Sequence, residues 1–288
     1  MIARSRPLIA AIFSVFIAAL LGGCVSVGPD NPAIKVSESQ ASDLLRKMER
    51  DPKPLARPVV VLGGYRGPES ETNGIMATLA DATSGKVSDF AAVSYRWYDD
   101  LDEICDKIVR EVNAKFPSKD PASTIEVDVV GISLGGLAAR WAAIPPEERV
   151  RPGKEAWHRE DGTMPKKRLN IVRLYTVVAP HQGVTMSSFL LPPGGVLADM
   201  GEDSGVVTTV NRRLAEGKST YEVVAYGSPR DSIAGDANFA PPGMKAVWTG
   251  GNLTGTHWAQ IDNPIFYADI ARRLRGEKPV AEPTKIPE

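Results

Sequence analysis

Ser133 stands in the stretch of the chain whose residue types and spacing best suit nucleophilic chemistry. Residues 131–135 read G-I-S-L-G, after a β-branched run at 124–130 that is typical of a buried strand. The Ala- and Leu-rich run at 134–144 ends at Pro145 and predicts a helix. Because no residues remain for a loop, the chain must turn sharply at Ser133, which requires small residues two positions before and after it. This pattern predicts a nucleophile elbow, which lifts a serine hydroxyl above the edge of a sheet.

Two plainer interpretations of the same five residues stay open. Ser133 could simply cap the following helix. The helix N-terminus could instead hold a phosphate, although the further glycines or the Lys-Ser/Thr pair of a phosphate loop are missing from the sequence.

A nucleophilic serine needs a base, and the sequence contains three histidines. His158 lies in a charged, proline-containing insertion and is expected to be exposed. His181 comes directly after a predicted strand at 169–179, so we expect it near the site. His257 follows the last predicted strand in a glycine-rich stretch, for which we predict a flexible loop. His257 is therefore the strongest candidate for the base.

The base in turn needs a carboxylate that orients it. Asp231 follows the predicted strand at 221–226 through G-S-P-R, and is our first choice. Asp236 is a close competitor, and weaker ones are Asp199, Asp203 and Asp262.

Predicted strands and helices alternate along most of the chain. The strands fall in residues 57–62, 87–97, 124–130, 169–179, 221–226 and 245–248, and the helices in 39–50, 73–82, 99–115, 134–144 and 264–274. This order predicts an α/β fold with a mainly parallel sheet of about six strands and helices on both faces. In such sheets the site lies at the carboxyl ends of the strands, where the candidate residues gather.

These motifs resemble the α/β-hydrolase superfamily, and within it the bacterial lipases and the GPI-inositol-deacylase-like serine esterases. The resemblance covers roughly residues 59–274. G-I-S-L-G-G at 131–136 stands where that branch usually has G-H-S-x-G-G, and A-P-H-Q-G at 179–183 is similar to its T-P-H-x-G. V-L-G-G-Y at 61–65 takes the place of its oxyanion strand, V-x-H-G-x, and residues 199–214 are similar to its lid-side segment. Ile132 and Gly63 stand where the branch usually has histidine.

The resemblance implies a serine hydrolase that cleaves acyl or lipid esters through an acyl-enzyme intermediate, with no cofactor. Ser133 would attack the ester carbonyl, His257 would carry the proton, and Asp231 would orient the imidazole. The backbone N–H groups of Tyr65 and Leu134 would form the oxyanion hole. Two other functions stay open: cleavage of an amide or thioester, and non-catalytic binding on the same scaffold.

The apolar segment at 184–196 is inserted directly above the predicted site. It predicts a lid, within a lid region at about 183–218, that would suit an acyl chain. Ordinary packing over the core is an equal alternative. We expect His181, just before this region, to help hold its strand end in place.

The N-terminal residues predict an export signal. A basic start is followed by an uncharged run at 8–21 and by L-G-G-C, which resembles the lipobox of bacterial lipoproteins. Residues 1–23 are then the signal peptide, and lipidated Cys24 anchors the protein to the cell envelope, with Val25 favouring the outer membrane. An uncleaved anchor helix is the alternative. We expect a tether and helix at 24–56, the hydrolase domain at 57–275, and a loose tail at 276–288.

Composition excludes several other classes of protein. Removal of residues 1–23 takes away Arg4 and Arg6 and no acidic residue, so the net charge of −1 becomes −3, which argues against nucleic acid as a partner. The second cysteine, Cys105, has no partner for a disulfide and is expected to be a small buried residue. Three scattered histidines lack the spacing of a metal site. Protein partners and oligomeric state are not predicted.

Overall fold

The structure, a computed structural model, describes residues 26–27, 31–151, 155–184, 194–231, 233–235, 237–252 and 256–287. Cys24 and the predicted signal peptide lie outside the described residues, as do residues 185–193 of the predicted lid.

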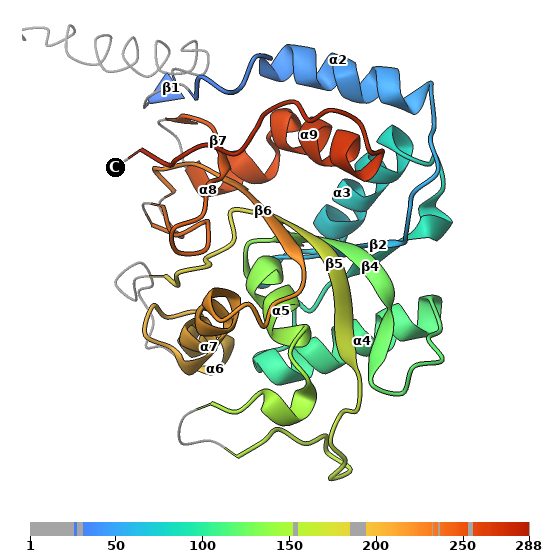
Figure 1. Cartoon of the computed structure of the whole chain (residues 1–288), viewed down its shortest axis with the longest axis vertical. Helices are drawn as coiled ribbons and strands as arrows, with labels where there is room; N and C mark the ends of the chain where they lie inside the picture. Colours follow the sequence, from blue (N-terminus) through green and yellow to red (C-terminus); the bar gives the residue numbers. More distant parts are fainter. Residues whose placement is uncertain are drawn as a thin grey trace, which may run out of the picture.

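One six-stranded sheet forms the centre of the protein (Figure 1). Every neighbouring pair of strands is parallel. The strand order is β3-β2-β4-β5-β6-β7, and the strands are β2 (Val59–Leu62), β3 (Phe90–Val93), β4 (Ser123–Ile132), β5 (Arg168–Val177), β6 (Glu222–Gly227) and β7 (Val247–Trp248). The predicted α/β class, with about six parallel strands, is confirmed.

Helices cover both faces of this sheet (Figure 1). On one face lie α4 (Leu101–Lys115), α5 (Leu134–Ala142), α6 (Gly195–Asp199) and α7 (Gly205–Ala215). On the other lie α3 (Glu69–Ala82) and α9 (Pro264–Leu274), with α2 (Glu38–Glu49) packed outside α9. The remaining elements are α8 (Thr256–Ile261), the 3-10 turns Val87–Asp89 and Pro146–Glu148, and the short antiparallel pair of β1 (Ser26–Val27) and β8 (Gly251–Asn252).

Most of the core lies in two apolar layers that the sheet separates, and a third, smaller cluster includes Phe239 and Trp248. Alternate residues of a strand point to opposite faces, so Val60 and Leu62 of β2 pack with the α4–α5 layer while Val59 and Val61 pack with the α2–α3–α9 layer. Because both faces are covered, the central strands are apolar almost without interruption.

Helix α3 begins at Glu69, four residues before the predicted start at Asn73. Pro68 is the N-cap residue, and two glutamates, Glu69 and Glu71, occupy the first turn. Carboxylates there are stabilised by the positive end of the helix dipole. The earlier start places Glu71 on a helix, directly after the loop that follows β2.

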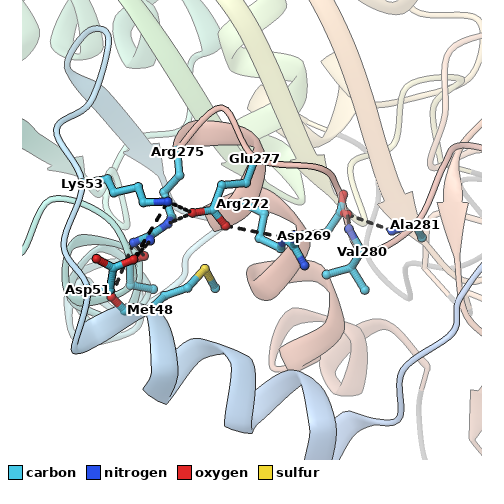
Figure 2. Close-up of polar contacts among 10 residues, drawn as sticks. Met48, Asp51, Lys53, Asp269, Arg272, Arg275, Glu277, Val280 and Ala281 are labelled. Atoms are coloured by element: carbon cyan, nitrogen blue, oxygen red, sulfur yellow. Dashed lines mark hydrogen bonds and ion pairs between the residues drawn. The ribbon is translucent and has the colours of Figure 1, made fainter.

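The C-terminal segment is not the loose tail that its proline and charge content predicts. The buried carboxylate Oδ1 of Asp269 on α9 accepts hydrogen bonds from the N–H groups of Val280 (2.5 Å) and Ala281 (3.0 Å), as Figure 2 shows. Thr284 pairs with Ala246, just before β7, in an antiparallel bridge. These partners are distant in sequence, and composition alone does not reveal them.

The same C-terminal segment is tied to the chain that enters the sheet. The carboxylate of Glu277 accepts hydrogen bonds from Lys53 Nζ (2.6 Å) and Arg275 Nε (2.8 Å), and Arg275 also pairs with Asp51 (Figure 2).

Among the helices of the described residues, none is long and apolar enough to span a membrane.

Candidate active site

Ser133 occupies a sharp turn between β4 and α5. Its backbone lies at φ 50° and ψ −120°, a left-handed conformation that a residue with a side chain rarely adopts, and its N–H donates to the carbonyl of Val177 at 2.8 Å. A Cβ at Gly131 would lie 2.6 Å from the nitrogen of Gly136, and one at Gly135 would lie 2.5 Å from the carbonyl oxygen of Leu62. The predicted elbow is therefore present, and backbone contact explains its glycines.

His257 links Ser133 to Asp231. The distance from His257 Nε2 to Ser133 Oγ is 3.2 Å, and His257 Nδ1 lies 2.8 Å and 3.0 Å from the two carboxylate oxygens of Asp231. A carboxylate only accepts, so Nδ1 carries the proton and Nε2 is left to accept the proton of the serine hydroxyl. The exposed fraction of both His257 and Asp231 is 2 %, which shields these bonds from water.

Asp231 is held in place by its own backbone turn as well. Its Oδ1 accepts hydrogen bonds from the N–H groups of Ile233 (2.8 Å) and Ala234 (2.9 Å). Its competitors are not in this position in the described part of the chain: Asp199 pairs with Arg151, and the weaker candidates at 203 and 262 are exposed. Asp236 lies outside the described residues.

His257 lies in the first turn of helix α8, and not in the flexible loop that its glycine-rich surroundings predict. Residues 251–252, before it, pair with residues 26–27 as β8 and β1, and residues 253–255 lie outside the described residues. The helix matters because it holds the imidazole to a rigid element; the T-shaped contact with Trp258 (5.5 Å between ring centroids) adds to this.

The loop after β2 lies beside the serine, where the resemblance places the oxyanion hole. A Cβ on Gly64 would lie 3.4 Å from Ser133 Cβ, and Tyr65 and Ser133 line the same pocket. The loop is fixed by two bonds at Gly63: its N–H donates to Val93, and its carbonyl accepts from the hydroxyl of Tyr95. Leu134 is the first residue of α5, so its N–H has no acceptor within the helix.

The two positions that depart from the related motifs have structural explanations. A Cβ on Gly63 would lie 2.6 Å from Thr72 Oγ1, so a side chain there would require the buried Thr72 side chain to move. Ile132 is fully buried in the apolar layer beneath α3 and α9, so it contributes to the core.

His181 is buried beside the site and held by three elements. Its Nδ1 lies 3.1 Å from Arg140 Nη1, its Nε2 lies 2.8 Å from Thr176 Oγ1, and its carbonyl accepts from Asn211. Burial, with the nearby Arg140 charge, holds the pKa of His181 well below its usual value, so the imidazole is neutral. His181 joins the end of β5 to α5 and α7, and none of its described contacts is to Ser133, Asp231 or His257.

A pocket of about 140 Å³ opens onto Ser133 and His257. Its lining is mostly apolar and comes from several parts of the chain. Besides Ser133 and His257, the lining residues are Gly64, Tyr65, Gly67, Glu71, Met200, Ile233, Trp258 and Ile261.

The predicted lid region contributes Met200 to this pocket. Val184 and Val196, the ends of the predicted lid segment, are buried in the core, and the residues between 185 and 193 lie outside the described part.

Glu71 is among the lining residues that the sequence did not predict. The sequence does contain a signal for Glu71: Pro68 followed by two acidic residues is typical of the start of a helix, and this start lies close to the loop after β2.

In the described ranges, no group of three or more His, Cys, Asp or Glu side chains is placed to hold a metal ion. Cys105 is buried in the core, and His158 is exposed.

No protein-family profile matches the sequence, and no curated protein matches it. Among solved structures, lipase B of Aspergillus fumigatus aligns with a TM-score of 0.48 at 16% identity, over 94% of this chain and 69% of that one. A gene product of Listeria innocua aligns with a TM-score of 0.47 at 15% identity, over 77% and 95%. The esterase domain of a Rhodothermus marinus protein aligns with a TM-score of 0.38 at 13% identity, over 77% and 89%.

Likenesses this distant do not carry an activity from one protein to another, so the narrower resemblance to lipases and inositol deacylases stays a prediction. The sheet and the elbow are features of this chain's own structure. With its parallel strand order and its strand–Ser133–helix turn, the chain has the α/β-hydrolase fold.

Proposed function

We propose that this protein is a serine hydrolase that cleaves carboxylic esters through an acyl-enzyme intermediate. The observation that carries the proposal is the hydrogen-bonded series from Ser133 Oγ through His257 to Asp231. Its members come from the carboxyl end of β4, from α8 and from the turn after β6, and they meet only in the folded chain.

In this mechanism Ser133 Oγ attacks the ester carbonyl while His257 Nε2 takes the hydroxyl proton. His257 then donates that proton to the leaving alcohol, and the acyl group stays on Ser133. Water, activated by the same imidazole, releases the acid and restores the serine. Asp231 holds the imidazole in the required tautomer and stabilises its protonated form.

The tetrahedral intermediate carries a negative charge on the former carbonyl oxygen. The backbone N–H groups of Tyr65 and Leu134 are our candidates for stabilising it, because the loop after β2 and the start of α5 flank Ser133. Loss of one such donor costs about 3 kcal/mol of transition-state stabilisation in other hydrolases.

The pocket supports an ester with a small or narrow group next to the carbonyl. Its lining is mostly apolar, as an acyl or alkyl group requires, and its volume of about 140 Å³ is below that of a typical drug-sized site. Acyl esters, including lipid esters, are therefore the proposed substrates. Amides and thioesters would need the same nucleophile, and a non-catalytic role in binding is the other alternative.

The test is hydrolysis of a p-nitrophenyl ester series by the wild type and by Ser133→Ala. We expect activity on short acyl chains in the wild type and a loss of at least about 10⁴-fold in kcat in the variant. Ser123→Ala, at the opposite end of the same strand, is the matched control and should keep wild-type rates. Activity that survives Ser133→Ala would overturn the assignment.

We further propose that the protein is anchored to the bacterial cell envelope through lipidated Cys24, with the outer membrane facing the periplasm as the site. The supporting observation is the signal sequence that ends in L-G-G-C. Metabolic labelling with a palmitate analogue should mark the wild type and leave Cys24→Ala unlabelled. Equal labelling of both would contradict the proposal.

A further inference from the structure

Glu71 places a carboxylate in a pocket that is otherwise largely apolar. It lies in the first turn of α3 and lines the same pocket as Ser133 and His257. A Cβ on Gly67 would lie 3.5 Å from Glu71 Oε1, which places the carboxylate over the loop that follows β2. Among the described residues Glu71 forms no ion pair. The mechanism proposed above does not use this charge.

We propose that Glu71 makes the pocket selective for esters whose alcohol part carries a small alkylammonium group. This inference rests on the proposed ester hydrolysis and names its substrate class.

The position of Glu71 in the pocket of His257 indicates that its carboxylate lies beside the alcohol part of the bound ester. His257 returns its proton to the leaving oxygen, so the groups around this imidazole surround the leaving alcohol. Glu71 and His257 line the same pocket, and Trp258 and Ile261 continue its wall. A cation two or three bonds from the leaving oxygen would thus lie near the carboxylate.

The electrostatics of this region favour a cation. Burial and the neighbouring Asp262 carboxylate raise the pKa of Glu71, while His257 acts in the opposite direction. Burial disfavours the ionised form of Glu71, and a cationic substrate beside the carboxylate would stabilise that form. Asp262 is exposed and also has no ion pair among the described residues, so it adds to the negative potential.

The aromatic residues of the pocket favour an alkylammonium over a bare metal cation. Tyr65 and Trp258 both line the pocket, and aromatic faces attract quaternary ammonium groups. The guanidinium of Arg66 already lies 5.1 Å from the ring centroid of Tyr65, so one cation is held on this ring outside the pocket. Trp258, with 60 % of its surface exposed, offers the larger uncovered ring.

The experiment compares two butyrate esters of the same shape, choline butyrate and 3,3-dimethylbutyl butyrate, which differ in the charge of one atom. Release of butyric acid is followed in a pH-stat at fixed ionic strength. For the wild type we expect kcat/KM to be about tenfold higher for the choline ester, and for Glu71→Gln we expect the ratio to fall to about one. Glu69→Gln, in the same helical turn but outside this pocket, is the matched control and should keep the wild-type ratio.

A second measurement separates this inference from the proposed function. Calorimetric titration with tetramethylammonium chloride, against sodium chloride, should show binding to the wild type and weaker binding, by about tenfold, to Glu71→Gln. Binding without any ester hydrolysis would support the cation pocket and contradict the hydrolase proposal. Hydrolysis with equal rates on the two esters, or a ratio unchanged in Glu71→Gln, would overturn the selectivity for cations and leave the hydrolase proposal intact.

Discussion

Two buried carboxylates, Asp231 and Asp269, have similar surroundings and different partners. Asp269 on α9 accepts from the Tyr226 hydroxyl (2.7 Å), from Arg273 Nε (2.7 Å) and from two backbone N–H groups of the C-terminal segment. Asp231 accepts from two backbone N–H groups and from His257.

The two carboxylates differ in whether the side chain that pairs with them can exchange a proton. Arg273 keeps its charge at all working pH values, so Asp269 forms a fixed structural link between α9, β6 and the C-terminal segment. His257 can gain and lose a proton, and its second nitrogen faces Ser133. Burial and hydrogen bonds are thus common to both carboxylates, and the titratable partner next to a nucleophile distinguishes the candidate site from the structural cluster.

The largest effect on rate is expected for Asp231→Asn. The amide offers no charge to stabilise protonated His257 and favours the wrong tautomer, so we expect kcat to fall about 10⁴-fold. Thermal unfolding should change little by comparison, because the amide oxygen can still accept the two backbone bonds. Burst and steady-state kinetics on a p-nitrophenyl ester measure the loss. A loss smaller than tenfold would show that another carboxylate, such as Asp236, orients the base.

Asp269→Asn should show the opposite pattern. The substitution leaves Arg273 without its carboxylate in a mostly buried position, and removal of one partner of such a pair costs about 3 kcal/mol of unfolding free energy. Urea denaturation measures this cost, and kcat of the remaining folded enzyme should stay within about threefold of the wild type. A large loss of kcat in the folded variant would mean that the two clusters are coupled.

The second buried histidine, His181, should affect stability below neutral pH. Its folded pKa is depressed, so below about pH 6.5 the unfolded chain binds a proton that the folded protein does not, and stability falls as the pH falls. Between pH 7 and pH 5 this contribution amounts to at most about 2 kcal/mol. Urea denaturation at both pH values should show a weaker pH dependence for His181→Gln than for the wild type. Equal pH dependence would show that the pKa of His181 is the same in the folded and the unfolded chain.

Sequence patterns predicted those parts of the site that local rules determine. The elbow is predicted by a strand, the G-I-S-L-G run and a helix that follow one another directly, although the contact that requires a glycine at Gly135 is with Leu62, far away in the sequence. The parallel sheet follows from the alternation of strands and helices. The final helix has its predicted bounds, Pro264–Leu274, and in the structure Asn263 caps its start while Pro264 occupies the first turn.

Features that depend on long-range contacts could not be predicted in the same way. The choice of Asp231 over its neighbours requires the position of α8, which no local pattern gives. The packing of residues 280–284 depends on partners such as Asp269 and Ala246. The glycine-rich surroundings of His257 indicate flexibility, yet tertiary structure places this residue on a helix.

Covalent labelling shows whether Ser133 is an activated nucleophile. A fluorophosphonate reacts with a serine only when a base activates the hydroxyl and the oxyanion site receives the phosphoryl oxygen. Peptide mapping of the labelled, folded wild type should place the modification on Ser133, and Asp231→Asn should label far more slowly while Asp269→Asn labels at nearly the wild-type rate. A folded protein that takes no label at Ser133 would show that this serine is not an activated nucleophile.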